Sequence, residues 1–102
     1  MKTISIDQLK QLEASKKEFL LLDVREPDEV AASSLYPGAT NIPMGKMFTE
    51  AGKGNLPKDV EIIIYCASGA RAGLVAQELG ARGYTIASVE GGYAALKEKD
   101  AH

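Results

Sequence analysis

The chain has 102 residues and contains no tryptophan, only one cysteine, Cys66, and only one histidine, His102. A lone cysteine cannot form an internal disulfide, and one histidine at the extreme C-terminus cannot complete a Cys/His zinc cluster with it. We therefore expect no structural metal and no cofactor. A chain of this length, treated as one domain over residues 1–102, can bury about 60–70% of its unfolded surface in a single core. The fold must then be held together by packing.

Long apolar runs and a charge excess are missing as well. No apolar stretch approaches the roughly 20 residues of a membrane span, and the N-terminus MKTISIDQLKQLE lacks the apolar region of a secretory signal. Apolar residues make up 45% of the chain and charged residues 25%, and the net charge of -2 offers no field that attracts nucleic acid. We expect a globular cytoplasmic protein that binds neither membranes nor nucleic acid.

What is present is an alternation of strand-like and helix-like segments. The continuous apolar character of residues 19–24 and 60–66 is typical of strands buried on both faces of a parallel sheet. Short strands are also predicted at 39–43 and 85–89. The predicted class is therefore α/β, with ligands bound beyond the carboxyl ends of the strands.

Helix signals lie between these segments. Ser5 and Gln8 have the spacing of a capping box, so a helix should begin at Ile6, and Pro27 suits the first position of a short helix that ends near Ala32. Residues 44–48 favour no more than one helical turn, and the turn formers of 49–59 predict a surface loop. A further helix is indicated by an apolar face of Ala72, Val75, Ala76 and Leu79, and Gly83 is expected to end it. A last helix is predicted in EGGYAALKEK.

Cys66 stands where the strand 60–66 ends and a helix follows. A helix N-terminus and a neighbouring cation favour the thiolate, the nucleophilic form of cysteine, and Arg71 supplies the cation. Because a cation at a helix N-terminus is itself unfavourable, Arg71 is expected to hold an anion rather than to be a solvated charge. The small side chains allow the backbone amides of residues 67–71 to form an anion-binding nest.

Two residues of this loop have alternative interpretations. A lone cysteine is most often inert core filling, but the position of Cys66 disfavours that role. Ser68 either caps the following helix or hydrogen-bonds a ligand, and we favour the cap.

Four motifs in order resemble the single-domain rhodaneses, which are thiosulfate sulfurtransferases: DVREPDEV at 23–30, GATNIP at 38–43, YCASGARA at 65–72 and EGGYAA at 90–95. The resemblance runs from Asp23 to Leu96. It implies a rhodanese-like α/β fold, with a central parallel sheet of about five strands flanked by helices on both faces. It also implies a catalytic cysteine that carries sulfane sulfur as a persulfide.

Residue by residue, the resemblance assigns a role to Cys66 as the catalytic cysteine and to the following loop as the substrate-binding segment. That segment is Ala67, Ser68, Gly69, Ala70 and Arg71, with the arginine associated with the sulfonate of thiosulfate. Asp23 and Arg25 match a pair found across the family. We expect them to order the sheet edge by hydrogen bonding, with a share in pocket electrostatics as the alternative.

The implied partners are a thiosulfate-like or persulfide sulfur donor and a thiol or cyanide acceptor, with a protein acceptor left open. Two departures from the family pattern concern packing. SSLYPG at 33–38 replaces the usual Gly-His-Ile ahead of the proline-glycine pair, and Leu96 stands where most relatives have tryptophan. We expect a locally different turn and a differently packed last helix.

Two other function classes are weighed against sulfur transfer. A rhodanese-like module that only binds partners typically lacks the cysteine, which this chain keeps. A cysteine phosphatase has one residue more between cysteine and arginine than the four here, Ala67 to Ala70. Both alternatives are therefore disfavoured, and sulfur transfer is expected.

Overall fold

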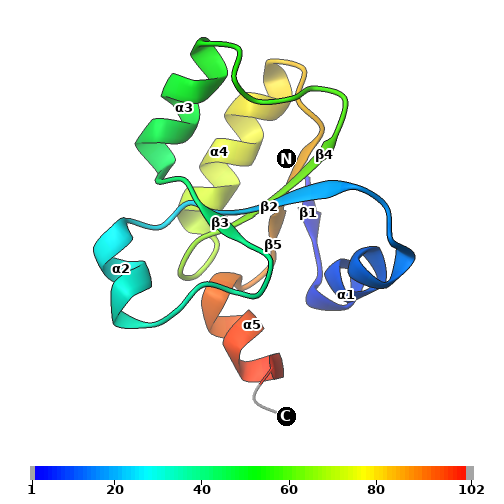
Figure 1. Cartoon of the computed structure of the whole chain (residues 1–102), viewed down its shortest axis with the longest axis vertical. Coiled ribbons are helices and arrows are strands. Elements are labelled where there is room, and N and C mark those ends of the chain that lie inside the picture. The colour runs from blue at the N-terminus through cyan, green and yellow to red at the C-terminus, as the bar shows by residue number, and fades with distance from the viewer. Residues whose placement is uncertain (1, 101–102) are drawn as a thin grey trace.

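The computed structural model describes residues 2–100, with side chains through Glu98, and His102 lies outside the described residues. Strands and helices alternate along the chain (Figure 1). Their bounds are β1 Thr3–Ile4, α1 Ile6–Ser15, β2 Phe19–Asp23, α2 Pro27–Ala32, β3 Thr40–Asn41, α3 Met44–Gly52, β4 Glu61–Tyr65, α4 Ala70–Ala81, β5 Ile86–Val89 and α5 Gly92–Asp100.

The strands form one five-stranded parallel sheet in the order β1-β5-β4-β2-β3, which confirms the expected fold class. β4 is the central strand, so the segment that leads to Cys66 has a neighbour on each side. The sequence did not predict β1, because two residues are too few to show a strand pattern. Thr3 and Ile4 pair with Ser88 and Val89 at the edge of the sheet.

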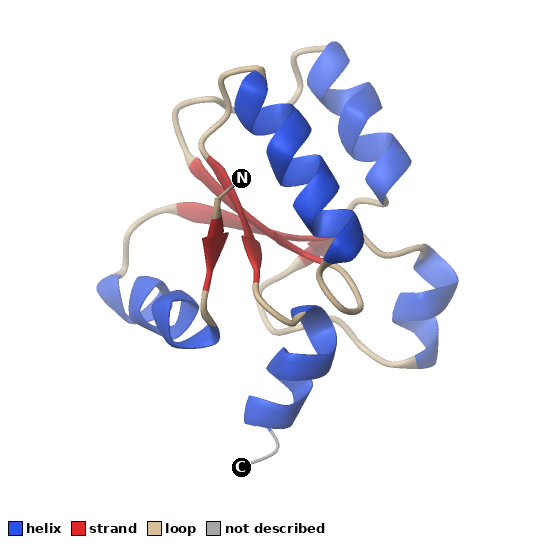
Figure 2. Ribbon diagram, turned by 180° about the vertical axis from the view of Figure 1, so that it is seen from behind, coloured by secondary structure: helices blue, strands red, loops and turns tan. Residues whose placement is uncertain are grey.

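Helices cover both faces of the sheet, as expected (Figure 2). Alternate residues of a strand point to opposite faces, so β4 supplies two cores. Ile62 and Ile64 pack in the core under α3 and α4, whereas Ile63 and Tyr65 pack in the core with α1 and α5. Leu96 of α5 is fully buried in the second core.

The helix signals at the start of α1 and the end of α4 are confirmed. Ser5 accepts a hydrogen bond from the Gln8 N–H, and the Gln8 side chain accepts one from the Ser5 N–H, which completes the capping box. Gly83 follows the last turn of α4 with a φ of 97°, the left-handed conformation expected of a glycine there.

The prediction for residues 44–59 was wrong in its boundary. α3 runs for nine residues, and Thr49–Gly52 belong to the helix rather than to a loop. The physical reason is an apolar face: Met47 is fully buried, and Phe48 and Ala51 pack against the same core. The strand expected at 39–43 is also shorter than predicted, at Thr40–Asn41.

Candidate active site

Cys66 follows the last residue of β4, and its side chain accepts two backbone hydrogen bonds from the loop and helix beyond it. The N–H of Gly69 lies 3.1 Å from Sγ, and the N–H of Ala72 lies 3.4 Å from it. Ala72 is the third residue of α4, whose N–H is the group that a side-chain cap usually satisfies. The sulfur therefore takes the position of a helix cap, in a residue that is only 1% exposed.

This arrangement corrects the expectation for Ser68. The N-cap of α4 is Gly69, at φ 114°, without a side-chain cap hydrogen bond, and Ser68 is exposed one residue earlier. A φ of this value is strained for a residue with a Cβ, so glycine suits the tight turn. The turn brings the Sγ of Cys66, rather than the hydroxyl of Ser68, to the amides at the start of the helix.

The start of α5 fixes the backbone of the same loop. The N–H of Tyr93 donates to the Cys66 carbonyl at 2.7 Å, and the N–H of Ala94 donates to the Ala67 carbonyl at 3.1 Å. Gly92 allows this approach, because a Cβ there would lie 2.6 Å from the Cys66 carbonyl oxygen. Since C=O and N–H point in opposite directions in a trans peptide, the N–H groups of Ala67 and Ser68 face away from α5.

Arg71 points across to α2, where it forms an ion pair with Glu29. Nη1 and Nη2 lie 2.7 and 2.8 Å from the two carboxylate oxygens, a bidentate geometry. These hydrogen bonds, together with one from the Glu26 N–H, hold the pKa of Glu29 at about 2, well below its usual 4.5. The same pair raises the pKa of Arg71 against the opposing effect of burial. The anion that Arg71 holds in this structure is a carboxylate of the chain itself.

Asp23 and Arg25 form a second ion pair, which is buried. The guanidinium makes three hydrogen bonds to the Asp23 carboxylate at 2.7 to 3.0 Å, and it also donates to the Ser33 hydroxyl and the Ser34 carbonyl. Burial lowers the pKa of Arg25, but hydrogen bonding to Asp23 and its charge outweigh that effect and raise it. The pair holds the segment after α2 against the carboxyl end of β2.

Tyrosines that the sequence analysis did not single out surround Arg25. Its guanidinium carbon lies 4.1 Å from the centre of the Tyr93 ring and 5.8 Å from that of Tyr65. Tyr93 also forms a hydrogen bond of 2.8 Å with Ser34, and the Tyr65 hydroxyl accepts the N–H of Tyr36. The segment 33–38 is thus held by β4 and α5. The signal available in the sequence was the tyrosine within each of the motifs YCASGARA and EGGYAA, Tyr65 and Tyr93.

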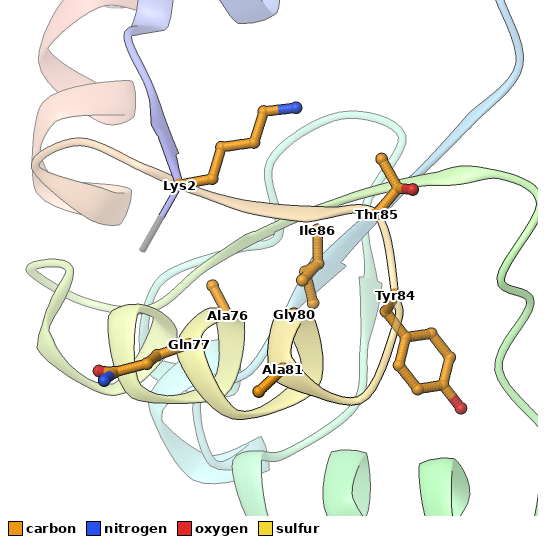
Figure 3. A pocket seen from close by; sticks show the side chains of 8 residues that line it. All are labelled: Lys2, Ala76, Gln77, Gly80, Ala81, Tyr84, Thr85 and Ile86. Atoms are coloured by element: carbon orange, nitrogen blue, oxygen red, sulfur yellow. The ribbon is translucent and has the colours of Figure 1, made fainter.

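A cavity of about 290 Å³ lies elsewhere, between α4 and the segment that leads into β5 (Figure 3). Its lining includes Ala76, Gly80, Tyr84 and Ile86, and Cys66 is not part of it. Ile86 is the first residue of β5, so the cavity lies toward the amino ends of the parallel strands, away from the loop. It has no part in the chemistry of Cys66.

Among the described side chains, those of residues 2–98, no three of His, Cys, Asp or Glu gather in a way that would hold a metal ion. Over residues 2–100, none of the helices has the length and apolar character needed to span a bilayer.

The sequence of this chain is similar to proteins of a known family. The model of the rhodanese-like domain matches residues 5–99. The chain belongs to the rhodanese-like family. The protein YtwF of Bacillus subtilis is 38% identical over 96 residues, which cover 90% of this chain and 86% of that protein. A sulfurtransferase of Allochromatium vinosum is 33% identical, with 87% of this chain and 81% of the relative covered.

A solved structure supports the same assignment. The human single-domain sulfurtransferase TSTD1 superposes with a TM-score of 0.81 at 28% identity, covering 97% of each chain. The rhodanese-like fold and the family are therefore established together.

Proposed function

We propose that this protein is a sulfurtransferase that carries sulfane sulfur as a persulfide on Cys66. The donor is thiosulfate or a persulfide, and the acceptor is a thiol or cyanide. The observation that carries the proposal is the pair of backbone N–H groups, from Gly69 and Ala72, that donate to Sγ. N–H donors that point at a sulfur stabilise negative charge on it during nucleophilic attack, which is the role that we assign to Cys66.

The first half-reaction is a displacement at sulfur. The Cys66 thiolate attacks the outer sulfur of thiosulfate, a new S–S bond forms, and the old S–S bond breaks with its electron pair on the departing sulfite. Sulfite leaves as a stable anion, so no proton has to be delivered to it. This step therefore needs no general acid.

In the second half-reaction the acceptor attacks the outer sulfur of the Cys66 persulfide. With cyanide, thiocyanate forms and the cysteine thiolate is regenerated, so atoms and charge balance over the cycle. Between the two steps the persulfide is an anion at a helix N-terminus, and we propose that the backbone amides of the loop Ala67, Ser68, Gly69, Ala70 and Arg71 stabilise it. The Arg71 guanidinium is the closing cation of that loop.

Asp23 and Arg25 support this site indirectly. Arg25 stacks on Tyr93, whose N–H donates to the Cys66 carbonyl, so the buried pair reaches the active loop through α5. We assign them a structural role beside the active loop.

Intact-mass measurement tests the proposal. Thiosulfate should add one sulfur atom to the wild-type chain, cyanide should remove it, and Cys66→Ser should acquire none. Equal labelling of Cys66→Ser, or no labelling of the wild type at saturating thiosulfate, would overturn the proposal.

A further inference from the structure

The guanidinium that closes the active loop is already occupied. Both of its terminal nitrogens are hydrogen-bonded to the two oxygens of Glu29, in a pair about one-third exposed at each side chain. Parallel N–H···O bonds of this kind are the geometry with which arginine also binds sulfonates and phosphates. An anionic donor that used Arg71 in this way would have to displace the carboxylate.

Glu29 is also held in place by a backbone hydrogen bond at the start of α2, its own helix. Its Oε2 accepts the backbone N–H of Glu26 at 2.8 Å, as part of the capping arrangement at the start of α2. α2 and the loop between β4 and α4 lie side by side in both views of the molecule (Figures 1 and 2). The carboxylate is therefore positioned by the fold, and it does not rely on Arg71 alone for its place.

Arg71 is also within electrostatic range of the nucleophile. The charge of Cys66 is among the causes that raise the pKa of Arg71, after the hydrogen bond and charge of Glu29. Its hydrogen bonds, however, are made to the Glu29 carboxylate, which both terminal nitrogens contact. An incoming anion meets a cation whose charge is already balanced.

We propose that Glu29 is a specificity-determining residue, whose carboxylate occupies Arg71 and selects against dianionic donors such as thiosulfate in favour of organic persulfides. This inference rests on the proposed sulfur transfer. A persulfide R–S–SH brings no sulfonate to the site. The Cys66 thiolate attacks the terminal sulfur of this donor, and a new S–S bond forms between Sγ and that sulfur. The S–S bond of the donor breaks, and R–S⁻ departs with its electron pair.

Steady-state kinetics give the first test. Glu29→Gln removes the negative charge but keeps an oxygen that can accept the Glu26 N–H, so α2 should persist. We expect the KM for thiosulfate to fall about tenfold with kcat within about twofold, while kcat/KM for a cysteine persulfide donor stays within about twofold. Asp28→Asn is the matched control, because it removes an exposed carboxylate from the same turn; its KM should match the wild type.

A second test does not depend on sulfur transfer. The rates at which iodoacetate, an anion, and iodoacetamide, which is neutral, alkylate Cys66 report the charge selection at the sulfur. Glu29→Gln should raise the iodoacetate to iodoacetamide rate ratio about tenfold, and the double variant with Arg71→Ala should lose that gain. Asp28→Asn should leave the ratio unchanged.

The outcomes separate the two proposals. An unchanged ratio in Glu29→Gln, or an equal rise in Asp28→Asn, would overturn the role of Glu29 even if sulfur transfer is observed. A raised ratio without any labelling by thiosulfate or persulfide would instead retain the charge selection and reject sulfur transfer. If Glu29→Gln does not fold, the wild type and Arg71→Ala alone decide: a wild-type ratio more than about tenfold above that of Arg71→Ala would show a guanidinium free for anions and would overturn the inference.

Discussion

The N–H of Ala72 donates to Sγ of Cys66 at 3.4 Å, so the side chain that would carry the chemistry also caps the helix behind it. Capping groups contribute about 1 kcal/mol to stability. Chemistry and local stability are coupled at this position, because a change that removes the sulfur also removes an acceptor from the first turn of α4.

This coupling predicts that Cys66→Ala is less stable than Cys66→Ser. Serine keeps an oxygen that can accept the N–H groups of Gly69 and Ala72, whereas alanine leaves both without their partner. We expect the free energy of unfolding of Cys66→Ala to be lower by about 1 kcal/mol, measured by urea titration. Equal midpoints for the two variants would show that an acceptor at this position does not stabilise the start of α4.

A second prediction concerns the contact between α5 and the loop. A Cβ at Gly92 would lie 2.6 Å from the Cys66 carbonyl oxygen and 2.9 Å from two backbone atoms of Ala67, and these are backbone atoms that cannot turn away. Gly92→Ala should therefore shift the loop, lowering kcat/KM by more than about tenfold and stability by about 1–3 kcal/mol.

Gly38 provides the matched control. It also has a positive φ, 89°, but a Cβ there would meet nothing within 4 Å. Gly38→Ala should carry only the backbone strain, with full activity per folded molecule. If the two variants lose activity equally, the close approach of α5 has no special role in the loop.

The helix α3 shows why part of the fold was misjudged from the sequence. Met44, Met47, Phe48 and Ala51 follow the same i, i+3, i+4, i+7 spacing as the apolar face that correctly predicted α4. The turn formers of 49–59 outweighed this pattern in the prediction. Tertiary packing decides such cases, because a buried Met47 stabilises a helix that local propensity leaves marginal.

The active loop was predictable in position but not in its partners. The end of a buried strand, small residues and a following helix placed Cys66 and Arg71 together. The partner of Arg71 lies 42 residues away, on a helix whose orientation no local pattern reveals. Arg25 and Tyr93 likewise meet only because α5 returns to the carboxyl end of β2 and β4. Local rules specify elements, and side-chain pairs across elements require the assembled fold.

The Glu29–Arg71 pair predicts a specific acid response. A carboxyl whose pKa is about 2 in the folded protein, and 4.5 ordinarily, stabilises the fold above pH 4.5, and this contribution is lost as the pH falls toward 2. Glu29→Gln lacks the titrating group. Its deficit in unfolding free energy relative to the wild type should therefore shrink over that pH range.

Urea midpoints measured at several pH values check this response. Asp28→Asn, from the same turn of α2, is the control. Parallel pH profiles for the wild type and Glu29→Gln would contradict a stabilising ion pair. If the difference in unfolding free energy between the wild type and Asp28→Asn shrinks equally at low pH, the effect belongs to overall charge instead.

The last prediction separates sulfur transfer from phosphate chemistry. Four residues, Ala67 to Ala70, lie between the cysteine and the arginine, and the shorter ring crowds a phosphoryl group where a persulfide sulfur would fit. The amides of Gly69 and Ala72 are already directed at Sγ, and Arg71 is bound to Glu29. The cation that would bind phosphate oxygens is therefore already paired.

Phosphomonoester hydrolysis also requires a proton for the leaving oxygen. Glu29 stays ionised because its pKa is about 2, and it is bound to Arg71, so it is not suited to donate one. We therefore expect no Cys66-dependent hydrolysis of p-nitrophenyl phosphate by a preparation that thiosulfate does label. The measurement is p-nitrophenol release by the wild type against Cys66→Ser. Turnover that the serine variant loses would favour the phosphatase, since it would show that the short loop admits a phosphoryl group and that a proton reaches the leaving oxygen by another route.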